Sequence, residues 1–313
     1  MDENRDRTPA GETAAAENPS PAAVPAPRKE KKPVRHMIWA VCLIALALVF
    51  LGQILGELLT GMLSLVLEIK DASTLFLFMY LAMIGVDLAA LLYTRLCERP
   101  VFRSFGRRAE PWGRGNTWGL FALGLLVGFA MNGLCILAAW LHGDLHFSLG
   151  QFRPLYLLAA LVCVCIQSGA EELVTRGYMM GALRDRYPVW VAVAVNSLLF
   201  GSLHLFNPGV TVLSIVNVTA FGLALSIVMV KLESLWFCIA VHTAWNFSQS
   251  IFFGLPNSGI VSQGSFLHLE AARDSGLYSA AFGIEGSVST TLVLALLSLG
   301  VLLWARRRQL RAG

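Results

Sequence analysis

Charged residues are scarce in this chain of 313 residues. They make up 14% of the sequence, hydrophobic residues make up 56%, and the mean hydropathy is +0.64. Soluble globular domains consist of about one quarter charged residues, so this composition excludes an ordinary soluble domain. We therefore expect an all-α, polytopic membrane protein.

Cysteine pairs and several catalytic signatures are also missing. The six cysteines include no CxxC pair, and all but Cys97 lie inside apolar runs, where they fit as small buried side chains. We therefore expect no disulfide framework and no thiolate metal site. The chain has no HExxH motif of zinc metalloproteases. The stretch IQSG at 166–169 lacks the first glycine of the serine-protease motif GxSG, and the stretch IGVD around Asp87 does not match the aspartyl-protease motif GxGD.

Long apolar runs, by contrast, fill most of the chain. A helix that spans a bilayer needs about 20 apolar residues, and eight segments meet or approach that length. They are 38–66, 73–96, 117–141, 155–183, 189–206, 210–230, 235–253 and 288–305. We therefore expect about eight transmembrane helices. The fifth run is short and ends at FNPGV, which leaves open whether it crosses the bilayer completely.

The positions of lysine and arginine predict the orientation, because cytoplasmic loops carry an excess of both. With the N-terminus inside, twenty of the 24 lysines and arginines fall in cytoplasmic segments. Lys70, Arg153 and Arg273 fall outside, and Arg176 lies within the fourth run. We therefore expect an integral membrane protein with both termini in the cytoplasm.

The sequence divides into five parts by composition. Residues 1–36, rich in alanine, proline and charge, predict a disordered cytoplasmic tail. Residues 37–150 hold the first transmembrane helices, 151–253 a helical core, 254–287 an extracytoplasmic segment, and 288–313 the last transmembrane helix with a basic cytoplasmic end. Within the extracytoplasmic segment, residues 265–282 predict a short interfacial helix. The basic end of the tail adjoins the first span, so we expect contact with membrane lipids. We expect no nucleic-acid partner, because interleaved aromatic residues are missing.

Three groups of polar residues interrupt the apolar runs between residues 155 and 253. They are Glu171, Glu172 and Arg176 in EELVTR, Phe200 and His204 in FGSLH, and His242 and Asn246 in HTAWN. A charged group in hydrocarbon costs a few kcal/mol. Each histidine or asparagine alone fits an ordinary packing role, such as an interhelical hydrogen bond. The three groups together favour a functional site.

Helical spacing gives the two glutamates different neighbours. Glu172 and Arg176 stand four residues apart, so they share a helix face and are expected to pair. Glu171 points about 100° away from Glu172 and has no local partner. A free carboxylate beside histidines and an amide suits hydrolysis. The carboxylate takes a proton from water, and the other groups donate to the oxyanion.

The three groups match, in order, the motifs EExxxR, FxxxH and HxxxN of the CAAX-protease and bacteriocin-processing family. Over residues 155–250 the chain resembles this family of intramembrane proteases, which includes the type II CAAX prenyl endopeptidases. The resemblance implies that residues 151–253 are the catalytic core. It implies an endopeptidase, which we expect to cleave near the cytoplasmic membrane face, in a cavity open to the cytoplasm. The substrate is then a peptide or protein, with or without a lipid modification.

The resemblance also implies a role for each motif position. Glu171 corresponds to the glutamate that activates water, and His204 to its partner in that step. His242 and Asn246 correspond to the pair that stabilises the oxyanion. The remaining pair, the second glutamate and the arginine of EELVTR, takes a supporting role.

The cofactor and two other classes of function stay open. The family is commonly described as metalloproteases, and Glu171, His204 and His242 are the set that would hold Zn²⁺. Because HExxH is absent and asparagine is a poor zinc ligand, we favour a glutamate mechanism without metal slightly over a zinc mechanism. One alternative is a non-catalytic membrane protein that acts in immunity or partner binding on the same scaffold. Another is a small proton-coupled transporter, although such proteins are typically built from two repeated halves, and this sequence shows no such repeat.

Overall fold

The structure, a computed structural model, describes residues 32–106 and 115–312. The described residues from Pro33 onward form one compact unit. The predicted disordered tail, residues 1–36, lies outside the described residues except at its end. There Val34–His36 form a single 3-10 turn, and the His36 side chain is buried.

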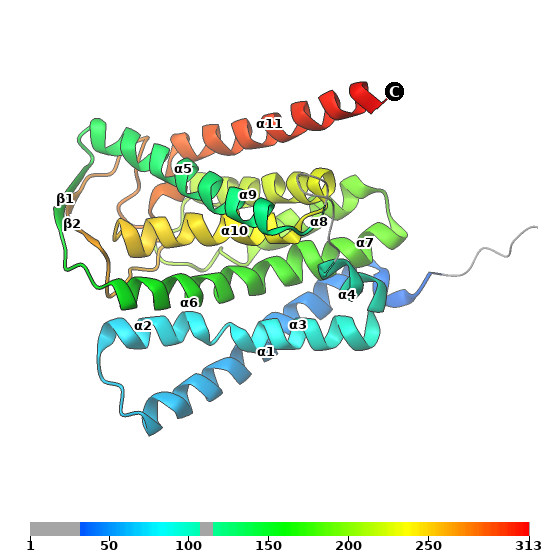
Figure 1. The fold of residues 1–313 in the computed structure, drawn as a ribbon, viewed down its shortest axis with the longest axis horizontal. Coiled ribbons are helices and arrows are strands. Elements are labelled where there is room, and N and C mark those ends of the chain that lie inside the picture. Colours follow the sequence, from blue (N-terminus) through cyan, green and yellow to red (C-terminus); the bar gives the residue numbers. More distant parts are fainter. Residues whose placement is uncertain (1–31, 107–114, 313) are drawn as a thin grey trace, which may run out of the picture. The chain divides into compact units, whose positions relative to one another are not determined.

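The described residues are helical almost throughout (Figure 1). In chain order the elements are α1 (Ile38–Val66), α2 (Ala72–Leu81), α3 (Ile84–Cys97), α4 (Arg99–Phe105), α5 (Trp118–Leu141), β1 (Leu145–Leu149), α6 (Pro154–Glu172), α7 (Met180–Arg186), α8 (Val189–Ser202), α9 (Val212–Leu232), α10 (Leu235–Asn246), β2 (Leu267–Ala272) and α11 (Val288–Ala312). Two π-helical segments, Leu173–Met179 and Phe247–Phe252, continue α6 and α10. This arrangement confirms the predicted all-α, polytopic membrane protein.

Six helical segments among the described residues are long and apolar enough to cross a bilayer. They are Ile38–Val66, Ala72–Cys97, Trp118–Leu141, Pro154–Arg186, Val212–Leu232 and Val288–Leu310. Two of the eight expected spans therefore differ from the prediction. The expected span 189–206 is the shorter helix α8, which has 14 residues. It rises by about 21 Å, whereas the hydrocarbon core of a bilayer is about 30 Å thick.

The expected span 235–253 differs because it is the innermost helix of the bundle. α10 runs through its π-helical segment to Phe252, and nearly all of its residues are buried. It packs chiefly against α5 and α6 (Figure 1). A helix surrounded by protein tolerates polar side chains that a lipid-facing helix would not. This position therefore fits the polar side chains that α10 carries, among them the buried His242 and Asn246.

The close packing of α5 on α10 depends on a missing side chain. A Cβ atom at Gly128 on α5 would lie 2.3 Å from the carbonyl oxygen of Val241 on α10. Only glycine lets the two backbones approach this closely. The contact fixes α10, and with it the polar residues that α10 carries.

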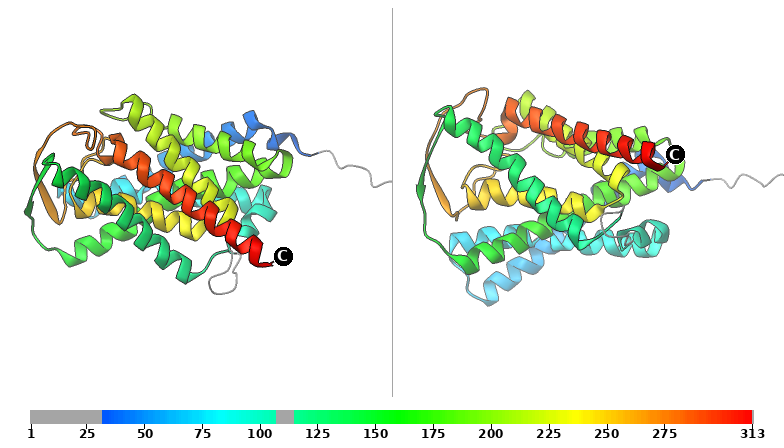
Figure 2. Two further views of the ribbon diagram at one scale, coloured as in Figure 1. Left: turned by 90° about the horizontal axis from the view of Figure 1, so that it is seen from above. Right: turned by 45° about the horizontal axis from the view of Figure 1, so that its top comes forward.

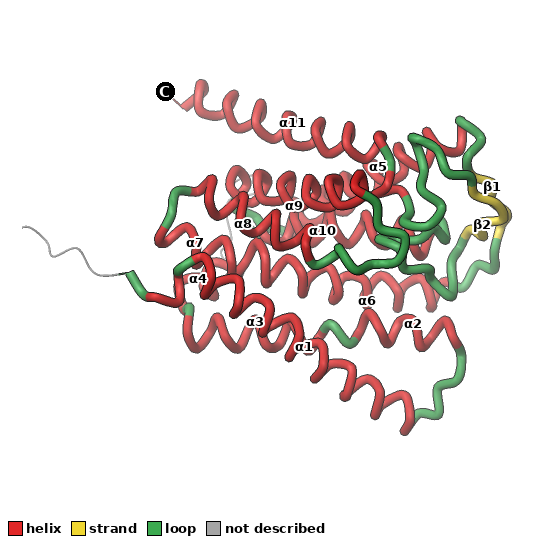
Figure 3. Tube along the Cα trace, turned by 180° about the vertical axis from the view of Figure 1, so that it is seen from behind, coloured by secondary structure: helices red, strands yellow, loops and turns green. Residues whose placement is uncertain are grey.

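The two ends of the helical bundle carry different structural elements. α4 and α7 lie at one end, which we call the inner end. β1, β2 and the segment 254–287 lie at the opposite end, which we call the outer end (Figures 1 and 3). α11 lies along α9 and also contacts α5, and it covers one side of the bundle (Figure 2). In the predicted orientation the inner end faces the cytoplasm.

The segment expected to form an interfacial helix forms a strand instead. Leu267–Ala272 is β2, which pairs with β1 in an antiparallel, two-stranded sheet. The prediction of a helix at 265–282 is therefore wrong. Its residues alternate in the period of two that is typical of a strand, with Leu267 and Leu269 separated by His268. The partner strand lies far away in the sequence, between α5 and α6.

Candidate active site

Two of the three helices that carry the polar motifs, α6 and α10, change their winding at the motif. α6 ends at Glu172 and continues as the π-helical segment Leu173–Met179. α10 ends at Asn246 and continues as the π-helical segment Phe247–Phe252. π-Helical turns are rare and occur frequently at functional sites. Their position here indicates that the backbone is adjusted to present these side chains.

Glu172 and Arg176 form a fully buried ion pair. Arg176 Nη1 donates to Glu172 Oε1 at 3.1 Å, and both side chains have 0% of their surface exposed. Arg176 also donates to the carbonyl oxygen of Gly222 on α9, and its guanidinium lies 4.7 Å from the centre of the Phe200 ring. The predicted pairing is thus confirmed. The pair ties α6 to α8 and α9 as well as neutralising its own charges.

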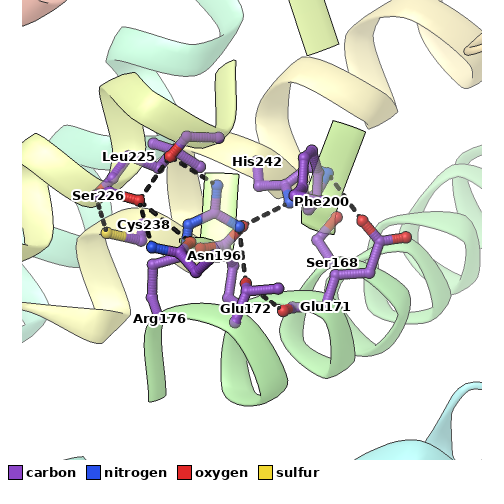
Figure 4. Close-up of polar contacts among 12 residues, drawn as sticks. Ser168, Glu171, Glu172, Arg176, Asn196, Phe200, Leu225, Ser226, Cys238 and His242 are labelled. Atoms are coloured by element: carbon purple, nitrogen blue, oxygen red, sulfur yellow. Dashed lines mark hydrogen bonds and ion pairs between the residues drawn. The ribbon is translucent and has the colours of Figure 1, made fainter. Parts of the chain in front are cut away.

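His242 lies between the two glutamates (Figure 4). Its Nδ1 is 2.9 Å from Glu172 Oε1, and its Nε2 is 3.7 Å from Glu171 Oε2. A carboxylate only accepts, so Nδ1 carries the proton and donates to Glu172. This hydrogen bond fixes the orientation of the imidazole. It turns Nε2 towards Glu171.

Glu171 is the more exposed of the two glutamates, with 24% of its side chain accessible. Gln167, one turn earlier on α6, donates from Nε2 to Glu171 Oε1 at 2.5 Å. The same glutamine accepts a hydrogen bond of 3.0 Å from Asn246 Nδ2. Gln167 therefore holds Glu171 and Asn246 in one arrangement.

Gln167 is a site residue that our sequence interpretation missed. The signal was its spacing, because Gln167 and Glu171 stand four residues apart and so share a helix face. The link of Gln167 to Asn246 crosses between two helices, so spacing alone does not reveal it.

His204 stands just beyond the end of α8, in the turn that follows Ser202. Its Nδ1 is 2.9 Å from the carbonyl oxygen of Phe200, so this nitrogen donates and Nε2 keeps its lone pair. Its ring centre is 5.0 Å from that of Phe200, which confirms the expected packing of these two side chains. Among the described residues, no hydrogen bond joins His204 directly to the glutamates.

One cavity of about 690 Å³ connects the predicted catalytic residues. Glu171, His204, His242 and Asn246 all contribute to its lining. Most of the remaining lining is apolar, from α1, α2, α8 and α9. The structure thus brings together four residues that come from three separate stretches of the sequence.

The arrangement does not match a metal centre. Within residues 32–106 and 115–312, no three histidine, cysteine, aspartate or glutamate side chains are placed so that they could hold one metal ion. Glu171, His204 and His242, the set that would hold Zn²⁺ if a metal were used, thus do not form such a group here. We therefore derive no step through a metal ion.

Comparison with known proteins agrees with the motifs. Residues 153–248 match the family described as type II CAAX prenyl endopeptidase Rce1-like. This segment is therefore similar to that family, and the match covers less than a third of the chain. A curated relative, the "Uncharacterized protein YyaK" of Bacillus subtilis (strain 168), is 29% identical over 177 residues. The match covers 54% of this chain and 55% of that protein, so the chain spans about half the length of this curated relative.

Proposed function

We propose that this protein is an intramembrane endopeptidase in which Glu171 activates the attacking water. The observation that carries the proposal is the position of the Glu171 carboxylate. It lines the cavity, Gln167 holds one of its oxygens, and the other lies 3.7 Å from His242 Nε2. One water molecule can reach both groups across a gap of this size. A carboxylate placed in this way is a suitable general base.

The reaction is a hydrolysis of a peptide bond. Glu171 takes a proton from water while the water oxygen bonds to the peptide carbonyl carbon. The C–N bond then breaks, and the leaving amine takes up the proton that the carboxylate has received. His204 offers Nε2 to the same cavity and assists the positioning of the water, because its Nδ1 is held by Phe200.

The carbonyl oxygen becomes negatively charged in the transition state and requires donors. Asn246 Nδ2 donates to Gln167 at 3.0 Å and to Ser168 Oγ at 3.5 Å. An oxyanion would take the N–H of the longer bond to Ser168. His242 Nε2, on the side of the ring away from Glu172, donates to the oxyanion when both ring nitrogens carry protons. Each such donor typically contributes about 2.7–4 kcal/mol to transition-state stabilisation.

Glu172 and Arg176 support this arrangement without contacting substrate. Arg176 balances the charge of Glu172, and Glu172 orients His242. A hydrogen-bonded carboxylate behind a catalytic histidine fixes both the ring and its tautomer. The pair thus acts on the reaction only through His242.

The substrate is a peptide or protein segment that reaches the membrane, with or without a lipid modification. The apolar walls of the cavity suit apolar side chains or an acyl chain. The proposed mechanism therefore makes one prediction that holds for any substrate. New peptide ends must depend on the Glu171 carboxylate.

This prediction is tested by comparing membranes that carry the native chain, the variant Glu171→Gln or the control variant Glu57→Gln. Glu57 is an exposed glutamate on α1 whose carboxylate accepts from Gln53. Mass spectrometry of labelled peptide termini should show ends that are present with the native chain and the control and absent with Glu171→Gln. Identical ends in all three samples would support a non-catalytic scaffold, and a Glu171-dependent proton flux without such ends would support a transporter.

A further inference from the structure

The cavity at the candidate active site begins well inside the bundle. On α1 the lining residue nearest to the inner end is Ala45, and on α10 it is His242. Each stands seven residues after the first residue of its helix, Ile38 and Leu235 respectively. At about 1.5 Å per residue, the cavity starts about 10 Å from the inner helix ends.

Packed side chains fill the space between the cavity and the inner end. One core cluster there includes Val41, Ala90, Leu183 and Ala192, and each of them has 0% of its surface exposed. Tyr178 belongs to the same cluster and meets Tyr93 edge to face. Helices α1, α3, α7 and α8 thus contact one another on this side of the site.

A cluster of charged groups lies at the inner end itself. His36 places Nδ1 2.9 Å from Asp185 Oδ2 and Nε2 2.9 Å from Glu98 Oε1. Arg35 donates from Nε to the same Glu98 oxygen at 2.6 Å. These contacts tie the start of α1 to the ends of α3 and α7. Among the described residues, they close the inner end over the packed cluster.

The cavity continues instead to the outer end. Its lining includes Asn207, beyond α8, and Asn257, Ser258 and Glu285 from the segment 254–287. Asn207 donates to the carbonyl oxygen of Ser258 at 3.0 Å, and the buried Glu285 accepts from Gln249 on the extension of α10. This wall is polar, and hydrogen bonds hold it in place.

The sides of the cavity are apolar and partly exposed. Phe50 on α1, Met79 on α2 and Phe206 beyond α8 line it with 57%, 45% and 95% of their surfaces exposed. An extended peptide has apolar side chains for such walls and backbone amides for the polar wall. The combination fits a peptide segment that arrives along the outer half of the bundle.

We propose that the substrate is a membrane-anchored or exported peptide that enters the cavity from the outer end, which is the extracytoplasmic side. This inference rests on the proposed function and on the orientation predicted by lysine and arginine. It replaces the expected cavity open to the cytoplasm and the expected cleavage near the cytoplasmic face. The peptide bond is then cut about halfway along the helix Pro154–Arg186, where Glu171 stands.

Single cysteines test the direction of entry. In a chain without its six native cysteines, Ser202→Cys and Ser258→Cys place a thiol on the cavity lining. Gly276→Cys reports the outer end, because that glycine is exposed and has no neighbour within 4 Å. A chain that keeps only the exposed native Cys97, at the inner end of α3, reports the inner side. All four are treated with a membrane-impermeant maleimide in sealed, right-side-out vesicles.

The expected result is that both cavity thiols and Gly276→Cys react in sealed vesicles, and that Cys97 reacts only after permeabilisation. Cavity thiols that react only together with Cys97 would overturn the proposal, and so would cavity thiols that react on neither side. If Cys97 reacted in sealed vesicles and Gly276→Cys reacted only after permeabilisation, the predicted orientation would be wrong, and the proposal would be overturned with it. The labelling is repeated in the Glu171→Gln chain. Labelling requires no catalysis. An unchanged labelling pattern in the Glu171→Gln chain therefore tests the route of entry independently of whether the proposed hydrolysis is correct.

Discussion

Replacing Arg176 should destabilise the protein strongly, whereas replacing Glu171 on the same helix should remove only activity. Arg176 is fully buried and donates to Glu172, to Thr175 and to the backbone of Gly222. In Arg176→Ala, the carboxylate of Glu172 would stay buried without its cation. Breaking a buried ion pair in this way costs about 3–5 kcal/mol. Glu171 is partly exposed and accepts one hydrogen bond, so Glu171→Gln should cost about 1 kcal/mol or less.

A double variant separates the loss of the pair from the loss of one partner. Glu172 Oε2 and Arg176 Nε are buried and, among the described residues, have no hydrogen-bond partner. The pair is thus incompletely satisfied, and uncharged side chains of similar volume can replace such pairs at little cost. Glu172→Gln combined with Arg176→Met should recover part of the stability that Arg176→Ala loses. The glutamine oxygen can still accept from His242.

The assay is thermal unfolding in detergent beside a peptide-cleavage measurement. Glu171→Gln should melt close to the native chain and lose activity by a factor of about 10²–10⁴. Glu57→Gln, on the exposed side of α1, should change neither quantity. The reasoning is refuted if Glu171→Gln melts early while Arg176→Ala melts normally. That result would mean that the two acidic positions have the opposite roles.

Three further variants, one of them with a matched control, test other parts of the account. Gln167→Ala should lower the rate of cleavage with little change in melting temperature, because Gln167 only orients Glu171 and Asn246; a large drop in melting temperature would instead indicate a structural role. Gly128→Ala should cost about 1–3 kcal/mol of stability through overpacking against α10, whereas Gly133→Ala, with no neighbour within 4 Å, should not destabilise α5. Burial raises the pKa of Glu285 above its ordinary value of 4.5. Its contribution to stability is therefore present below that pH and is lost as the pH rises through the raised value. Melting temperatures at pH 5 and pH 8 should differ less in Glu285→Gln than in the native chain, and equal differences would contradict this.

The sequence predicted those features of the site that depend on one helix. The spacing of Glu172 and Arg176 predicted their ion pair, and the spacing of Phe200 and His204 predicted their packing. Composition predicted a polytopic helical protein. The two pairings use only neighbours within about one turn of helix, whose geometry is nearly constant.

The features that the sequence did not predict depend on contacts between distant segments. Nothing in the spacing indicates that His242 bonds to Glu172 or that Asn246 bonds to Gln167. The strand Leu267–Ala272 pairs with a partner more than a hundred residues earlier in the chain. α8 ends at Ser202, although the apolar run in the sequence continues to residue 206. The end of this helix therefore also depends on its surroundings in the fold.

Hydrolysis in water enriched in ¹⁸O tests the central claim most directly. If Glu171 activates water, each cleaved peptide gains ¹⁸O at its new carboxyl end, because the attacking oxygen comes from the solvent. Membranes that carry the native chain or Glu57→Gln should yield peptides with this label at shared positions. Membranes that carry Glu171→Gln should lack the labelled peptides, although the protein is present and folded. Labelled ends that persist unchanged with Glu171→Gln would contradict the assignment of Glu171 as the base.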